Sequence, residues 1–137
     1  MSAPTLSIAQ DQAFTGLFQA IAAPDLAQRW QGLLHGKPAK WAKIHPWRCW
    51  PGDMYRNWPV GLSWPAMRDQ AMAQAQQAGM QTLHGLACGH SGPELVSLSP
   101  ADMLGWMDGL LEGFVVLIPQ RLALIHNHEG GHWLWTA

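Results

Sequence analysis

The stretch FVVLIPQRLALIHNHEGGHWLWTA, residues 114–137, decides the fold class. It contains three short apolar runs, FVVLI, RLALIHNH and HWLWTA, separated by Pro119-Gln120 and by Glu129-Gly130-Gly131. Short runs rich in β-branched and aromatic residues, bounded by turn residues, are typical of antiparallel hairpins. We therefore expect three strands in an antiparallel meander over this part of the chain.

Two more strands and one helix are expected immediately before this meander. The runs MQTLHGLAC at 80–88 and ELVSL at 94–98 have the length and composition of strands. The sequence SPAD at 99–102 has the cap, proline and acid of a helix start. We expect this helix to run to about Glu112 and to end at Gly113.

The same helix is expected to contain two interior glycines, Gly105 and Gly109. Each glycine costs about 1 kcal/mol relative to alanine inside a helix. An interior glycine usually has a packing reason. We therefore expect both to lie where the helix packs closely on the sheet or on another helix.

Two amphipathic helices are predicted before residue 37. Residues 8–22 place Phe14, Leu17, Phe18 and Ile21 on one helical face, after a capping box of Ser7 and Gln10. The second helix is expected over 25–35, with Gly36 placed to end it.

A third helix is predicted over residues 63–78. Ser63 can cap it, Pro65 suits its first turn, and Gly79 can end it. Its apolar stripe is expected to consist of Trp64, Met67, Ala71, Ala75 and Ala78.

These elements make a single α+β domain of 137 residues. We expect N-terminal helices and a four- or five-stranded, mostly antiparallel sheet packed against helices. The parts are a helical region at 7–36, a Trp- and Pro-rich loop at 37–62, a helix at 63–78 and a sheet-rich region at 80–137. The loop is expected because its four prolines remove backbone donors and disfavour helix.

Low charge is the main feature of the composition. Asp, Glu, Lys and Arg make up 12% of the residues, against roughly 25% in an average soluble protein.

The N-terminus does not have the pattern of an export signal, and no run reaches the ~18 apolar residues of a membrane helix. Cys49 and Cys88 are too few for a disulfide framework, and whether they pair stays open. We expect a cytoplasmic protein without membrane association, and low charge with many tryptophans is compatible with a homo-oligomer.

The cations gather in one segment of the chain. Six of the eight lie between residues 29 and 56, and five tryptophans lie between residues 41 and 64. Aromatic residues and Arg are the most frequent hot spots of protein interfaces. We therefore expect a non-enzymatic inhibitor, adaptor or accessory subunit that contacts a protein partner through Lys43, Trp47, Arg48, Trp50, Tyr55 and Arg56.

The same aromatic and basic segment admits two other interpretations. Most of its rings can be buried to anchor a loop that has few hydrogen bonds, each ring removing ~150 to 250 Å² from water. Alternatively, the rings stack on the bases of a single-stranded nucleic acid and the cations meet its phosphates. The sequence pI of 6.6 is far below the value of about 9 typical of nucleic-acid-binding domains, which favours a protein partner.

A metal-dependent hydrolase is the enzyme alternative. The sequence IHNHEGGHW carries His126, His128 and His132. A three-residue loop pairs His128 with His132 and brings all three imidazoles to one face, whereas a two-residue loop pairs Glu129 with His132 and sends His132 to the other face. Convergent histidines would bind zinc with an open position, and Glu129 would act as general base. Solvated turn histidines are the simpler interpretation, so we expect no cofactor and keep zinc as the alternative.

Cys88 is a candidate nucleophile between His84 and His90. A thiolate nucleophile needs a base within hydrogen-bond reach. On one strand, His84 and Cys88 would share a face but lie about 13 Å apart, at 3.3 Å per residue. His90 reaches Cys88 only if Gly89 bends the chain back. We therefore expect Cys88 to be a small buried apolar residue.

Overall fold

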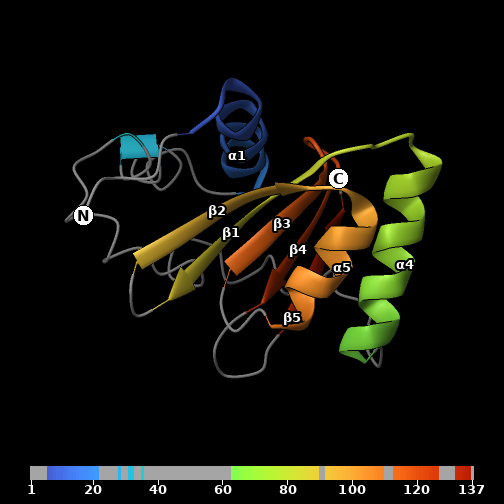
Figure 1. Ribbon diagram of the computed structural model, residues 1–137. Helices are drawn as coiled ribbons and strands as arrows, with labels where there is room; N and C mark the ends of the chain where they lie inside the picture. The colour runs from blue at the N-terminus through green and yellow to red at the C-terminus, as the bar shows by residue number, and fades with distance from the viewer. Residues whose placement is uncertain are drawn as a thin grey trace.

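The computed structural model describes residues 6–21, 28, 31–32, 35, 63–89, 92–109, 113–126 and 132–136. The main elements follow one another along the chain as shown in Figure 1. Their bounds are Ile8–Ile21 (α1), Trp64–Gln77 (α4), Leu83–Gly89 (β1), Gly92–Leu98 (β2), Pro100–Asp108 (α5), Gly113–Ile118 (β3), Leu122–His126 (β4) and His132–Thr136 (β5).

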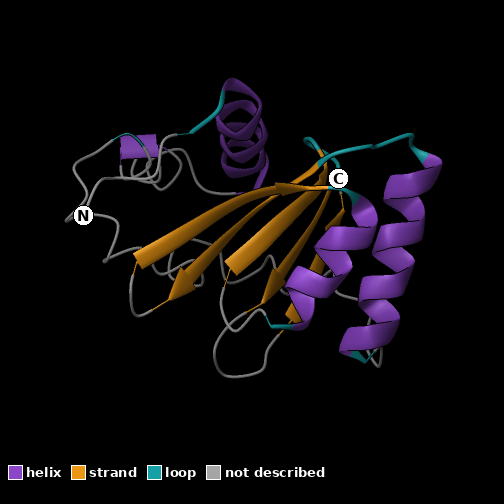
Figure 2. Ribbon diagram, in the orientation of Figure 1, coloured by secondary structure: helices purple, strands orange, loops and turns teal. Residues whose placement is uncertain are grey.

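The five strands form one sheet in the order β2-β1-β3-β4-β5 (Figure 2). All four neighbouring pairs are antiparallel. β1 and β2 pair along their whole length, α5 then leads to β3 on the other side of β1, and β3, β4 and β5 form the meander. The predicted α+β class, with a four- or five-stranded, mostly antiparallel sheet packed against helices, is confirmed, and the sheet has five strands.

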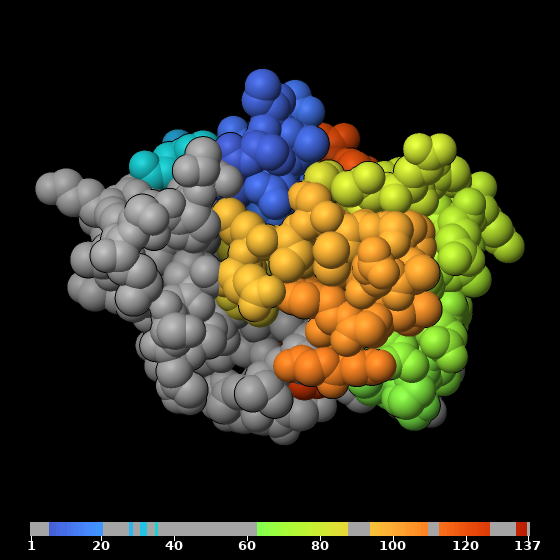
Figure 3. All heavy atoms as spheres, in the orientation of Figure 1, coloured from blue at the N-terminus to red at the C-terminus, as the bar shows by residue number. Residues whose placement is uncertain are grey.

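The helices lie on both faces of the sheet, with α1 on one face and α4 and α5 on the other (Figures 1 and 2). The alternation of side chains along β3 explains this arrangement. The ring of Phe114 meets Phe14 and Phe18 of α1 edge to face, with centroids 5.4 and 5.8 Å apart. The next residue, Val115, belongs to the buried cluster that includes the methionines of α4 and α5. In the space-filling view, α4 and α5 form one continuous surface, and α1 occupies a separate margin (Figure 3).

The predicted helix starts are confirmed for the three helices. At α1, Ser7 N–H donates to Gln10 Oε1 over 3.0 Å, and Gln10 N–H donates to Ser7 Oγ over 3.1 Å, which is the reciprocal capping box. Ser63 and Ser99 cap α4 and α5 by accepting from backbone N–H groups. Within the second expected helix, 25–35, the described residues 28, 31 and 32 are helical, and residue 35 lies in a turn.

The apolar stripe predicted for α4 is correct except at its C-terminal end. Met67, Ala71 and Ala75 are buried as expected, and Met72 is buried in addition. Ala78 is exposed, because the helix ends at Gln77 and Ala78 is its C-cap, so this residue leaves the helical face. Gly79 follows with a φ of 77°, a left-handed conformation that suits glycine.

The prediction that two interior glycines of α5 pack closely on the sheet or on another helix is wrong. The helix ends at Asp108 and Gly109 is its C-cap, so Gly109 is not interior and the helix does not reach Glu112. Gly105 is exposed, and a Cβ added there would meet nothing within 4 Å. The sheet-facing side of α5 instead carries Met103 and Met107, which are fully buried, so the glycine faces away from the sheet.

The close approach between helix and sheet occurs at a glycine of the sheet. A Cβ on Gly85 of β1 would lie 2.9 Å from Cζ3 of Trp106 in α5. The indole of Trp106 therefore lies on the bare backbone of β1, and its Nε1–H donates to Glu94 Oε1 of β2 over 3.1 Å. This contact fixes α5 across the β1–β2 edge of the sheet.

Pro119 and Gln120 form the turn between β3 and β4, as predicted. Arg121 N–H donates to Ile118 C=O over 3.0 Å, and Gln120 has a φ of 62°. A proline followed by a residue with positive φ inside such a bond is the pattern of a type II turn. None of the described helices has the length and hydrophobicity needed to cross a bilayer.

Candidate functional site

The residues predicted to contact a partner lie outside the described part of the chain: Lys43, Trp47, Arg48, Trp50, Tyr55 and Arg56. The described residues next to this segment are His35 and Ser63. His35 Nε2 lies 3.0 Å from Asp11 Oδ1 on α1, and Ser63 caps α4 on the opposite face of the sheet. The segment is thus joined to the domain at α1 on one face and at α4 on the other.

The histidine hairpin has a register that differs from both predicted loops. His126 is paired with His132, so neither His128 nor Glu129 is the partner of His132. Both predictions took the register from the glycines of the turn. The ladder is instead fixed further along, where Leu124 pairs with Leu134 and both are buried.

The three histidines can be placed only in part. His128 and the side chain of His132 lie outside the described residues. The ring of His126 meets that of Trp64 edge to face, with centroids 5.0 Å apart. No group of three or more His, Cys, Asp or Glu residues within the described ranges has the arrangement of a metal site. Zinc binding by this hairpin stays a prediction.

His84 was considered in the sequence only as a base for Cys88, whose side chain is not described. The structure pairs His84 of β1 with Ser97 of β2 as direct neighbours across the ladder. Their side chains meet, with Nδ1 of His84 lying 2.8 Å from Oγ of Ser97. The sequence could have predicted this contact. If the two expected strands form a hairpin with its turn at residues 90–91, His84 and Ser97 lie opposite each other.

Gln10 links this histidine–serine pair to the start of α1. Its side chain is 8% exposed and bridges two elements. The Ser7 N–H donates to its Oε1, which leaves Nε2 to donate to Ser97 Oγ over 2.9 Å. The capping box was predicted, but the second half of this bridge was not, because it spans 87 positions of the chain.

Two hydrogen bonds meet at Oγ of Ser97, one from Gln10 and one with the ring of His84. Ser97 Oγ accepts from Gln10, and its single hydrogen is then available for Nδ1 of His84. In that arrangement Nδ1 is an acceptor, and a neutral imidazole carries its hydrogen on Nε2. Partial burial lowers the pKa of His84 below its ordinary value, since desolvation disfavours the charged ring. Burial thus favours the neutral form of this histidine. We name Ser7, Gln10, Ser97 and His84 the polar relay.

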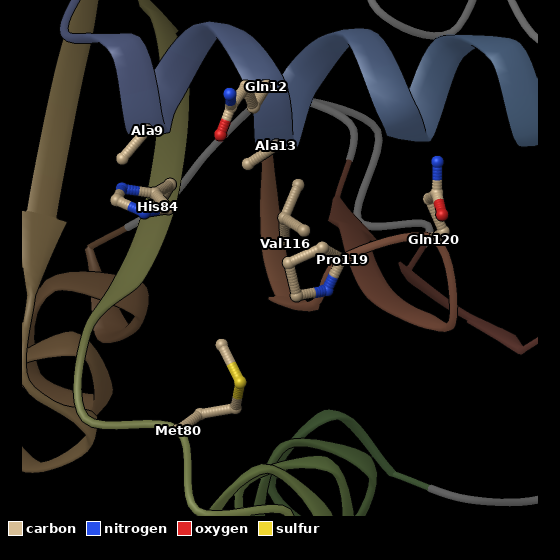
Figure 4. A pocket seen from close by; sticks show the side chains of 8 residues that line it. All are labelled: Ala9, Gln12, Ala13, Met80, His84, Val116, Pro119 and Gln120. Carbon is tan, nitrogen blue, oxygen red and sulfur yellow. The ribbon is translucent and has the colours of Figure 1, made fainter.

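The polar relay ends in a pocket between α1 and the sheet (Figure 4). The pocket has a volume of about 310 Å³. Its lining comes from α1, from the two strands beneath it and from the connections beside them: Ala9, Gln12, Ala13, Met80, His84, Val116, Pro119 and Gln120. In Figure 4, His84 lies below Ala9 at one end, Pro119 and Gln120 lie at the other end, and Met80 lies across from α1.

Small side chains on α1 and an unusual turn residue shape the two ends of this pocket. α1 presents only alanines and a glutamine to it, while its phenylalanines pack on β3 nearby. At the far end, Gln120 has a positive φ, which is uncommon for a residue other than glycine and costs roughly 1 to 2 kcal/mol. The Cγ of Gln120 lies 3.1 Å from where a Cβ of Gly16 would be, so the absence of a side chain at Gly16 admits the glutamine.

The described charges lie away from this pocket. The cations among the described residues are Arg68 and Arg121, and the acids are Asp11, Asp69, Glu94, Asp102 and Asp108. Arg68 is ion-paired with Asp108, which joins α4 to α5, and lies 3.6 Å from Asp69. None of these groups lines the pocket, so its described walls are uncharged when His84 is neutral.

Comparisons with models of known protein families, with curated proteins and with solved structures found no match. The described site has an uncharged, mainly apolar pocket with a neutral histidine whose proton is positioned by the polar relay. Such a site can hold a small molecule and direct one hydrogen bond to it.

Proposed function

We propose that this protein is a small non-enzymatic binding protein, of the inhibitor, adaptor or accessory-subunit type. It contacts a protein partner through an interface segment that comprises residues 40–64. The observation that carries the proposal is the separation of charge in the chain. Residues 29–56 carry six of the eight cations and one acid, whereas the described residues carry two cations and five acids.

The composition of the described core supports this function. Its fully buried side chains are Phe, Leu, Ile, Met, Val and Ala, and they include none of the tryptophans whose side chains are described. Trp64, Trp106 and Trp135 are only partly buried. The described side chains thus form this core without a fully buried indole. This favours a role in contacts for some of the tryptophans in the interface segment, since exposed aromatic and Arg residues together are typical of hot spots.

The proposal is tested with substitutions in the interface segment. Trp50→Ala and Arg56→Ala are each expected to weaken the complex by about 2 kcal/mol, or roughly thirtyfold in Kd, measured by calorimetry with the purified partner. Arg121→Ala is the matched control, because Arg121 is an exposed arginine outside the segment. Unchanged affinity in both segment variants contradicts the proposal.

A single-stranded nucleic acid is the competing partner for the same residues, because aromatic rings and cations are interleaved there. A fluorescently labelled single-stranded oligonucleotide, titrated at two salt concentrations, separates the two possibilities. Binding to nucleic acid must weaken steeply as salt rises, because each phosphate contact releases counterions. We expect no salt-sensitive binding; its presence would replace the protein partner with a nucleic acid.

A further inference from the structure

The pocket under α1 has the size and lining of a small-molecule site. Ligand pockets typically range from roughly 300 to 1,000 Å³ and combine apolar walls with a few placed polar groups. This pocket, at about 310 Å³, lies at the lower end of that range. Its apolar walls are Ala9, Ala13, Met80 and Val116, so a small and largely apolar body fits it.

The polar relay gives this pocket one directed hydrogen-bond donor. Ser97 Oγ lies 2.8 Å from Nδ1 of His84, and Gln10 fixes the serine by donating to it over 2.9 Å. With Nδ1 occupied as an acceptor, the hydrogen of the neutral ring is on Nε2. No hydrogen bond to Nε2 is formed by the described residues, so this donor remains for a ligand. The hydrogen bond to Ser97, which Gln10 holds in turn, fixes the orientation of His84 more firmly than that of a free surface histidine.

The opposite end of the pocket carries an amide in a strained position. Gln120 occupies the position of a type II turn that glycine or asparagine normally takes. Backbone strain of this kind is concentrated at ligand-binding sites, where the side chain is needed. The amide of Gln120 supplies a donor NH2 group and an acceptor oxygen at the end of the pocket away from His84 (Figure 4).

We propose that this pocket binds a small, uncharged organic molecule with an apolar body and a carbonyl oxygen. The carbonyl accepts a hydrogen bond from Nε2–H of His84, the body lies along Ala13 and Val116, and the amide of Gln120 contacts the other end. An uncharged ligand is required because the described lining has no charged partner for an ion. This site is separate from the interface segment, so either proposal can fail without the other.

The first experiment uses benzamide as the probe, in the full-length protein labelled with ¹⁵N. Benzamide has a flat apolar body and a carbonyl, and a probe of this size is expected to bind with a Kd on the order of 1 mM. We expect saturable shifts in the amide signals of Ala13, Val116 and Gln120. The absence of saturable shifts at these positions overturns the proposal.

A variant that fills the pocket locates the binding. Ala13→Leu adds volume to the lining at a residue that is 2% exposed, and it is expected to abolish the shifts. Ala73→Leu is the matched control, since Ala73 is exposed on α4 at the other face of the sheet. If Ala13→Leu does not fold, Ala9→Leu makes the same change at an exposed lining position. Shifts that persist in the filled variant mean that benzamide binds elsewhere, which refutes the site.

A second probe tests the hydrogen bond. Toluene has a similar apolar body and no carbonyl. In His84→Phe, which keeps a ring but removes the donor, benzamide is expected to bind about fivefold more weakly, whereas toluene affinity stays within about twofold. Equal changes for the two probes, or none for benzamide, contradict the assigned role of His84.

Discussion

The most informative perturbation of this structure is the replacement of Gln10. In Gln10→Leu the side chain keeps a similar size but loses both hydrogen bonds that it makes, one from Ser7 N–H and one to Ser97 Oγ. Each is worth about 1 kcal/mol net, so the free energy of unfolding should fall by about 2 kcal/mol. Because Gln10 is 8% exposed, water cannot fully replace these partners.

Gln10→Glu separates the two roles of this residue. A carboxylate still accepts from Ser7 N–H, and glutamate is the usual partner in a capping box, so α1 keeps its start. A carboxylate cannot donate to Ser97. The serine hydroxyl then donates to Glu at position 10, Nδ1 of His84 must carry a hydrogen of its own, and the pKa of His84 rises relative to the wild type.

Two measurements check this pair of variants. Urea unfolding should show a loss of about 2 kcal/mol for Gln10→Leu and a smaller loss for Gln10→Glu. The ¹⁵N chemical shifts of the His84 ring should report hydrogen on Nε2 in the wild type and on Nδ1 in Gln10→Glu. A stability of Gln10→Leu within about 0.5 kcal/mol of wild type, or an unchanged tautomer in Gln10→Glu, would refute the polar relay.

Three further predictions concern stability. Burial lowers the pKa of His84 in the folded state, so this residue binds fewer protons there than in the unfolded state. The free energy of unfolding of the wild type should therefore fall as the pH drops from about 7 to about 5. The urea midpoint of His84→Gln should fall less over the same range. Gly85→Ala places a Cβ 2.9 Å from Trp106 and should lower the free energy of unfolding by about 1 to 3 kcal/mol. In a double-mutant cycle, Trp106→Phe should recover part of this loss, whereas strictly additive losses would argue against the contact. Ser99→Ala removes the cap of α5 and should lower the free energy of unfolding by about 1 kcal/mol, whereas no change in urea unfolding would mean that the cap is replaced by water.

The fold was predictable from the sequence because its local signals agree with each other. The Ser7–Gln10 capping box, the Ser63 cap and the Pro119-Gln120 turn each act over a few residues, and all three are found. Their agreement with the apolar pattern of the strands explains why the α+β class was correct.

The wrong predictions concern features for which the local sequence signal is ambiguous, or for which contacts between distant residues determine the structure. Gly105 and Gly109 were taken as packing positions, but the spacing of glycines does not say which side of a helix faces the sheet; Met103 and Met107 decide that. The register at His132 follows from buried leucines along the ladder and not from the glycines of the turn.

The pocket was missed for a related reason. Its residues come from α1, β1, β3 and the adjoining connections, and no local pattern joins them. His84 and Ser97 become neighbours only through the β1–β2 register, and Gln10 reaches Ser97 only when α1 lies on that face. The site therefore forms only when the fold brings these residues together.

The central claim is that residues 40–64 carry a protein-binding surface. The most direct test is quantitative affinity purification from a lysate of the source organism, with the tagged full-length chain and its Trp50→Ala/Arg56→Ala and Arg121→Ala variants as baits, followed by calorimetry with the retained protein. We predict one protein that is retained by the wild type and by Arg121→Ala, and that loses at least about thirtyfold in affinity for the double variant. A protein retained equally by all three baits, or none retained by the wild type, would contradict the claim.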